Sequence, residues 1–185
     1  MMPPLLESTR LVLRPFRDED TRPITEFCGD LAVSRWLTSV PHPYPAWAAK
    51  GFISKAQGPG EVHWAIERAG APGLIGVIGM NRAKEGAHLG YWVAPPYWGQ
   101  GLASEAAGMV VAWAFTEARH PALTSGAFAG NHASLRIQEK LGFRETARRA
   151  RYCLALDRPM MHIDTRLARE DWQGQGAQSD QEAGA

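Results

Sequence analysis

The residue types between Trp92 and Glu105 favour a site that binds an anion. This stretch reads Trp-Val-Ala-Pro-Pro-Tyr-Trp-Gly-Gln-Gly-Leu-Ala-Ser-Glu, so prolines end a strand and a glycine turn leads into a helix. Glycines let a ligand approach the backbone closely, and a helix start adds unpaired N–H groups with partial positive charge. The segment predicts a cradle for a diphosphate, although the local pattern alone leaves a plain strand-to-helix turn equally open.

Two familiar phosphate motifs do not match this segment. A P-loop needs Gly-Lys-Ser/Thr at the start of the helix, but Gly101 is followed by Leu102 and Ala103. A dinucleotide fingerprint needs a third glycine, and Ser104 stands in its place.

A second segment, Asn-His-Ala-Ser-Leu-Arg-Ile-Gln-Glu-Lys-Leu-Gly-Phe at 131–143, has the pattern of a short capped helix. Asn131 suits the N-cap, Lys140 the last turn and Gly142 the position after the helix. We expect this helix over residues 131–141.

The surrounding sequence predicts an antiparallel sheet that carries both segments. Three strands joined by short turns imply a meander, and a second long helix is expected over 102–118. A further helix is expected to start at Asp18–Thr21, and the prolines of 36–47 predict a shaped loop. The expected strands are 11–13, 62–67, 74–80, 87–93, 122–129, 145–155 and 160–168.

Composition restricts the class of protein. The 185 residues suit one domain, and 20 Lys+Arg against 19 Asp+Glu argue against nucleic acid as a partner. Cys28 and Cys153 lie far apart and match no metal spacing, so we expect no metal and a reducing, cytoplasmic environment. No signal peptide or membrane-length apolar run is visible, so no membrane partner is expected.

The two segments together resemble the GCN5-related N-acetyltransferases. Trp-Gly-Gln-Gly-Leu-Ala at 98–103 is similar to the family's acetyl-CoA loop, Gln/Arg-x-x-Gly-x-Gly/Ala, with Trp98 where Gln or Arg is usual. The helix at 131–143 is similar to the family's Asn-x-x-Ser/Ala helix that ends in Lys-Leu-Gly-Phe. The motifs come in the family's order and separation. The fold implied is a mixed, mostly antiparallel sheet of six or seven strands with helices on both faces.

Further segments resemble the ribosomal-protein-alanine (Rim-type) branch, in which Trp98 also recurs. They are Leu-Val-Leu-Arg-Pro-Phe-Arg-Asp-Glu-Asp at 11–20, Gly-Tyr-Trp-Val at 90–93, Gly-x-Ala-Ser-Glu-Ala at 101–106 and Leu-Ala-Arg-Glu-Asp-Trp at 167–172. The resemblance spans residues 9–172, which we expect to be the acetyltransferase domain. Residues 1–8 are then an N-terminal extension, and 173–185 a disordered tail.

The implied reaction is acetyl transfer from acetyl-CoA to a primary amine, either a protein N-terminus or a small molecule. The pantetheine arm would lie along Trp92 and Val93, whose N–H is the expected oxyanion donor. Asn131 would cap its helix and also contact the cosubstrate. The remaining expected acetyl-CoA residues are Trp98, Gly99, Gln100, Gly101, Leu102, Ala103 and Ser104.

The catalytic acid and base are the less specific assignments. Many family members carry a tyrosine acid where this chain has Gln138, so Ser134 is the candidate acid, or else it orients a water or bonds back to its own helix. His88 has the pKa of a useful base, but a hydrogen-bonded sheet histidine is an equally simple interpretation. Glu61 and His63 carry no distinguishing signal.

The acceptor pocket is expected to draw on Trp36, Tyr44 and Trp47, which the resemblance places beside the amine. No acidic cluster for a polycation is visible, which disfavours an aminoglycoside. Two alternatives stay open: a non-catalytic acyl-CoA-binding module and a nucleotide-binding regulator. The chain is expected to be a monomer or a homodimer.

Overall fold

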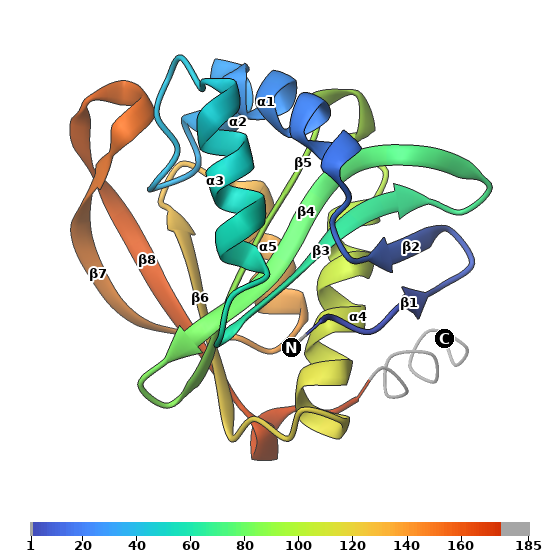
Figure 1. Cartoon of the computed structure of the whole chain (residues 1–185). Helices are drawn as coiled ribbons and strands as arrows, with labels where there is room; N and C mark the ends of the chain where they lie inside the picture. Colours follow the sequence, from blue (N-terminus) through green and yellow to red (C-terminus); the bar gives the residue numbers. More distant parts are fainter. Residues whose placement is uncertain (1, 175–185) are drawn as a thin grey trace.

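The computed structural model describes residues 2–174. Within that range the chain forms one sheet of eight strands in the order β1-β2-β3-β4-β5-β6-β8-β7 (Figure 1). All neighbouring strands are antiparallel except β5 and β6, which confirms the expected mixed sheet. The strands are β1 (Leu6–Glu7), β2 (Leu11–Arg14), β3 (Glu61–Arg68), β4 (Ala71–Ala83), β5 (Gly86–Val93), β6 (Ala122–Phe128), β7 (Arg144–Cys153) and β8 (Arg158–Ala168).

Helices cover both faces of this sheet, as expected, and each face buries its own apolar core. On one face lie α1 (Thr21–Gly29), α2 (Leu31–Ser34) and α3 (Ala46–Ala56); on the other lie α4 (Leu102–Thr116) and α5 (His132–Lys140) (Figure 1). Because helices pack on both sides of the central strand β4, all of its residues from Leu74 to Met80 are buried.

One strand, β1, and two α-helices, α2 and α3, were not expected from the sequence. The two-residue strand β1 pairs with β2 and is too short to leave a hydrophobic pattern. Helix α3 begins at Ala46, directly after Pro45, so the expected loop over 36–47 is shorter. A proline at a helix start removes only an N–H that would have no partner there, so Pro45 begins this helix rather than breaking it.

The two helices nearest the glycine segment begin as the sequence predicted. The backbone of Gly101 has a φ of 75° and ends the turn before α4. In α5 the side chain of Asn131 accepts a hydrogen bond from the N–H of Ser134 at 3.2 Å, and Gly142 follows the helix with a φ of 93°. These residues fix where both helices start and where α5 stops.

Strands β5 and β6 separate part-way along their length. They pair only at Ala87 with Leu123 and at His88 with Thr124. Beyond that point the hydroxyl of Ser125 donates to the carbonyl of Leu89 at 3.0 Å. The gap that then opens between the strands is the feature that positions the site.

The predicted domain boundaries at 9 and 172 remain predictions. Leu6–Glu7, inside the predicted extension 1–8, forms β1, and the carbonyl of Pro4 accepts a hydrogen bond from Trp64 Nε1 at 2.7 Å. The predicted disordered tail, 173–185, lies outside the described residues from 175 onward. Over residues 2–174, the helices are all too short or too polar to cross a bilayer.

Candidate active site

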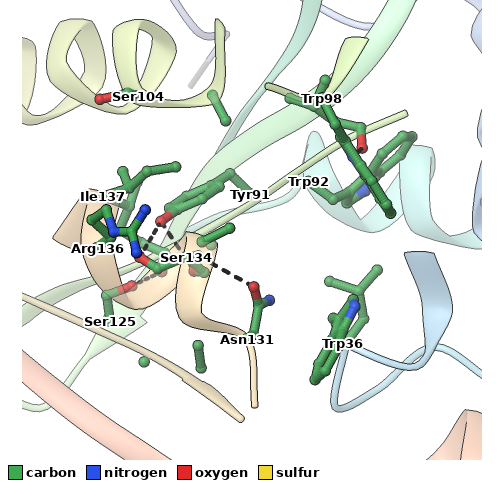
Figure 2. A pocket seen from close by; sticks show the side chains of 18 of the residues that line it. Trp36, Tyr91, Trp92, Trp98, Ser104, Ser125, Asn131, Ser134, Arg136 and Ile137 are labelled. Carbon is green, nitrogen blue, oxygen red and sulfur yellow. Dashed lines mark hydrogen bonds between the residues drawn. The ribbon is translucent and has the colours of Figure 1, made fainter. Parts of the chain in front are cut away.

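A cleft of about 580 Å³ follows the gap between β5 and β6, a size usual for ligand sites. Strand β5 forms one wall, α5 the opposite wall and the glycine turn before α4 one end (Figure 2). Trp36, in the segment after α2, closes the far side across from Asn131 (Figure 2). The cleft therefore joins segments that are far apart in the sequence.

The glycine turn forms a row of free backbone donors at one end of the cleft. In the described part of the chain, no N–H from Gly99 to Ser104 donates to a protein acceptor. Gly99 and Gly101 both have positive φ, 74° and 75°, which turns successive amides toward the same side. A row of N–H groups at the start of a fifteen-residue helix is suited to bind a diphosphate.

Two side chains from the segment between β1 and β2, Arg10 and Ser8, hold this turn in place. Arg10 donates to the carbonyl of Gln100 at 3.0 Å and to Glu105 Oε2 at 2.7 Å. Ser8 donates to the other oxygen of Glu105 at 2.6 Å. Glu105 is thus engaged with Arg10 and Ser8, in keeping with a role at the helix start rather than in catalysis. The turn is preorganised by contacts that do not use its own N–H groups.

The amide of Val93 points into the gap rather than toward β4. The N–H of Ala94 donates to the carbonyl of Ile75 at 2.8 Å, and the register pairs Val93 with Gly76. Backbone amides alternate in direction along an antiparallel strand, so the N–H and carbonyl of Val93 face away from β4.

The other groups along this edge of β5 agree with that direction. The carbonyl of Leu89 already accepts from Ser125 across the gap, and the carbonyl of Val93 accepts from Trp98 Nε1 at 2.6 Å. The Trp98 bond ties the glycine turn to the end of β5. Among residues 2–174 the N–H of Val93 has no acceptor outside the strand ladder, so it can donate into the cleft that Val93 lines.

Ser134 lies on the opposite wall in a connected set of hydrogen bonds. Thr165 donates to Gln138 Oε1 at 2.7 Å, and Gln138 Nε2 donates to Ser134 Oγ at 3.1 Å. The phenol of Tyr91 lies 3.1 Å from Ser134 Oγ and donates to the Ser134 carbonyl at 3.2 Å (Figure 2). Since Gln138 donates to the serine oxygen, the serine O–H is left to donate toward Tyr91 or into the cleft.

Tyr91 is a cleft residue that the sequence analysis did not single out as functional. Its position in the Gly-Tyr-Trp-Val segment placed it on a strand, but only the fold brings its phenol to Ser134. Burial raises the pKa of Tyr91, so the phenol stays protonated at neutral pH.

His88 lines the cleft with its ring held by a neighbouring strand. Its Nδ1 lies 3.1 Å from the hydroxyl of Thr124. Burial, together with the nearby charge of Arg151, lowers the pKa of His88. The imidazole is therefore neutral at neutral pH, as a base must be.

A second histidine, His162 of β8, also lines the cleft and was not assigned a role from the sequence. Its Nδ1 lies 2.8 Å from Asp164 Oδ1. The signal was present as His-x-Asp on a strand, since residues two apart lie on the same face. The other two candidates, Glu61 and His63, bond to each other at 2.8 Å and lie outside the cleft lining.

Most of the expected acetyl-CoA residues meet in the cleft, whereas only one of the three expected acceptor residues lines it. Every expected acetyl-CoA residue except Gln100 is part of the lining, as is Trp36. Tyr44 packs into the core under α1 and α3, where burial raises its pKa to about 12. Trp47 is exposed on α3. Neither Tyr44 nor Trp47 lines the cleft.

The charges around the cleft are cationic or neutral. Arg136 and Lys140, on α5, are part of the lining together with the two histidines. Considering residues 2–174, the lining includes neither Asp nor Glu. Gly90 lies on the floor, and a Cβ built there would meet no atom within 4 Å. The cleft thus suits an anionic ligand at one end and has open space beside Gly90.

Comparison with known proteins gives a family and a fold. The family described as "Acetyltransferase (GNAT) domain" matches residues 10–144. The N-acetyltransferase YoaA of Bacillus subtilis, itself uncharacterized, is 30% identical over 148 residues, which is 77% of this chain and 84% of YoaA.

Solved structures share the whole fold. A GNAT-family acetyltransferase from Bacillus anthracis superposes with a TM-score of 0.79 at 20% identity, covering 90% of this chain and 99% of that one. Spermidine N-acetyltransferase from Vibrio cholerae, crystallised with CoA and spermine, has a TM-score of 0.77 at 17% identity and covers 89% and 98%. At these identities the likeness concerns the fold.

Proposed function

The chain belongs to the GNAT family of N-acetyltransferases, and we propose that it transfers the acetyl group of acetyl-CoA to a primary amine at the cleft between β5 and β6. GNAT enzymes use acetyl-CoA. The acceptor we propose is a protein N-terminal α-amine, as in the Rim-type branch, or a small-molecule amine.

The residues present fit a CoA diphosphate. The free N–H groups from Gly99 to Ser104 would bind its oxygens, and their direction is set before the ligand arrives by Arg10 and Trp98. Arg136 and Lys140 add positive charge on the facing helix, and Asn131 adds an amide at its start. A preorganised row of donors loses little entropy on binding.

The acyl carbonyl of the thioester would receive its hydrogen bond from the N–H of Val93. As the amine nitrogen attacks this carbonyl carbon, negative charge develops on the oxygen. One backbone donor aimed at such a charge typically contributes about 3–4 kcal/mol in the transition state. Val93 is suited to this because its N–H faces away from β4, at the end of β5 beside the glycine turn.

The CoA thiolate needs a proton when the carbon–sulfur bond breaks, and Ser134 is the proposed donor. Its O–H is free because Gln138 and the backbone cap supply the other bonds of the residue. The neutral phenol of Tyr91, 3.1 Å away, would replace that proton in the next step. His88, the base expected from the sequence, lines the cleft with its Nδ1 held by the hydroxyl of Thr124.

The absence of carboxylates from the described cleft lining supports an acceptor with few positive charges. A polyamine would find no counter-charge there. An α-amine, with an ordinary pKa of about 8 against about 10.4 for lysine, is also easier to deprotonate. Cytoplasmic localisation and a monomeric or dimeric state stay predictions.

The proposal depends on the free backbone N–H groups from Gly99 to Ser104. Substitutions of Gly99 and of a control glycine, Gly70, test it. Gly99 and Gly70 have the same φ, 74°, and at both a new Cβ would meet no atom within 4 Å. Changing either to alanine therefore costs similar backbone strain, but only Gly99 lies in the turn.

We expect Gly99→Ala to weaken CoA binding at least tenfold in calorimetry, and Gly70→Ala to leave it within twofold of wild type. Wild-type protein should also acetylate at least one member of a panel of α-amine peptides and small primary amines. Equal CoA affinity in the two variants, or no heat with CoA at all, would refute the proposed cradle.

A further inference from the structure

On β8, His162 lines the cleft, and Asp164, outside the lining, is its hydrogen-bond partner. They share one face of β8, because residues two apart on a strand do, and it is the face opposite to Thr165, which bonds Gln138 of α5. The register places Asp164 opposite Gly126 of β6. A Cβ at Gly126 would lie 2.4 Å from His162 Cε1, so the imidazole lies directly over this glycine and extends across β6 toward β5.

The contacts of this ring leave one nitrogen for a ligand. Nδ1 is 2.8 Å from Asp164 Oδ1, and the ring packs edge-on against Phe128 at 5.5 Å. Nε2 makes no hydrogen bond with any residue between 2 and 174. His162 lines the cleft while its side chain is only 7% exposed. A ring held at one nitrogen and free at the other has the geometry of an oriented base.

We propose that His162, positioned by Asp164, removes the proton from the acceptor's ammonium group. This inference rests on the proposed acetyl transfer. The ammonium N–H⁺ gives its proton to His162 Nε2, which leaves a neutral amine and an imidazolium. The amine lone pair forms the new bond to the thioester carbon and the carbon–sulfur bond breaks. The thiolate takes a proton from Ser134, which Tyr91 replaces, and the second proton lost by the nitrogen as it becomes an amide restores that proton to the phenol through water. The imidazolium then releases its proton to water.

The charges around His162 keep it neutral before the reaction and stabilise it afterwards. Facing it are Asp164 on β8, Arg149 and Arg151 on β7, and His88 on β5. Burial and the charge of Arg151 lower the pKa of His162, while Asp164 acts to raise it. The neutral form therefore prevails at neutral pH, and Asp164 stands ready to stabilise the imidazolium once it forms.

His88 is a weaker candidate for removing the proton from the acceptor's ammonium group. Its ring bonds to the neutral hydroxyl of Thr124, and among the described residues no carboxylate lies at hydrogen-bond distance. We therefore assign His88 to the acceptor wall rather than to proton removal. His88 and His162 both line the cleft, so replacing each one separately compares their roles.

The first experiment measures kcat/KM against pH for His162→Asn and His88→Gln, with a short peptide that has a free α-amine as acceptor. Loss of a general base typically costs about 10²–10⁴-fold. We expect His162→Asn to lose at least 10²-fold and to lose the rise of kcat/KM at acidic pH. His88→Gln should lose less than tenfold and keep that rise. His120→Asn, remote from the cleft, should match the wild type.

Asp164→Asn provides a test of positioning that does not depend on the His162 variant folding well. Because Asp164 raises the pKa of His162, its removal should move the acidic rise of kcat/KM to lower pH and reduce the plateau. A purely structural role would lower the rate equally at every pH. NMR titration of the His162 ring in wild type and Asp164→Asn should show the same shift without any turnover.

The outcomes separate this inference from the function on which it rests. Wild-type rate and pH profile in His162→Asn, or loss of the acidic rise in His88→Gln alone, would overturn the assignment of His162 and leave acetyl transfer intact. A wild-type protein that binds CoA but acetylates no amine would overturn both.

Discussion

Gln138 is the residue whose replacement most directly probes how the fold sets up Ser134. Its side chain is fully buried, and each end of its amide makes one hydrogen bond: it accepts from Thr165 at 2.7 Å and donates to Ser134 at 3.1 Å. Leucine has nearly the same volume and neither polar group. Gln138→Leu therefore removes both bonds while keeping the packing.

The expected loss of stability follows from the partner that stays behind. Thr165 is 6% exposed, so its hydroxyl would be left buried without an acceptor. An unsatisfied buried polar group costs about 1–3 kcal/mol. Gln138→Leu should lower the free energy of unfolding by about that amount in a denaturant titration.

A second substitution separates this cost from a simple packing defect. Thr165→Val removes the stranded hydroxyl at constant shape, and replacing both partners by apolar groups can be nearly neutral. The double variant Gln138→Leu/Thr165→Val should therefore recover most of the stability. It should not recover activity, because Ser134 still lacks the amide that orients its hydroxyl.

Steady-state kinetics complete the test. We expect Gln138→Leu and the double variant to show a similar fall in kcat, about tenfold, which corresponds to about 1.4 kcal/mol in the barrier. Ser134→Ala sets the lower limit of kcat, and KM for acetyl-CoA should change little in all three. Wild-type kcat in the stable double variant would refute the idea that Gln138 orients Ser134. If the stability losses of Gln138→Leu and Thr165→Val simply add in the double variant, the explanation by an unpaired Thr165 hydroxyl is refuted.

Two further predictions concern the acceptor floor and a buried ion network. Gly90→Val fills the open space above the floor, so KM for the amine should rise about tenfold while CoA affinity in calorimetry stays within twofold; an unchanged KM would place the acceptor elsewhere. Arg14 bonds both Asp20 and Glu67 at 2.7 Å, so Arg14→Met should cost about 3–5 kcal/mol in denaturant titrations. The Arg14 bond also lowers the pKa of Glu67 below its ordinary 4.5. A carboxyl with a lowered folded pKa adds stability that is present above pH 4.5 and lost as the pH falls through the folded pKa. Wild type should show this acid loss, and Arg14→Met should show less of it; an identical acid dependence in both would contradict the role of the network.

Local patterns predicted the parts of the site that depend on the backbone. The prolines and glycines of 94–101 act on their own φ and ψ angles, and Asn131 caps the helix three residues away. Such effects act within one turn of chain, so they can be read in order along the sequence. That is why the glycine turn, α4 and α5 lie where expected; the fold class, which the family resemblance implied, was confirmed as well.

The side chains that meet across the cleft could not be read in that way. Tyr91 and Ser134 are 43 residues apart, and the fold joins them only because β5 and β6 diverge beside α5. His162 comes from β8, whose place beside β6 is set by sheet order rather than by neighbouring residues. Tyr44 and Trp47 show the converse: their aromatic character matched an acceptor pocket, but Tyr44 packs against the core, Trp47 is exposed on α3, and neither lines the cleft.

The amino-acid sequence alone specified the proposed acetyl-CoA end of the cleft, where a strand, a glycine turn and a helix follow one another along the chain. The tertiary structure decided the proposed acceptor end. Hydrogen bonds between side chains from distant strands depend on sheet order and on the few ångströms by which two strands separate, and no local pattern of residues encodes either.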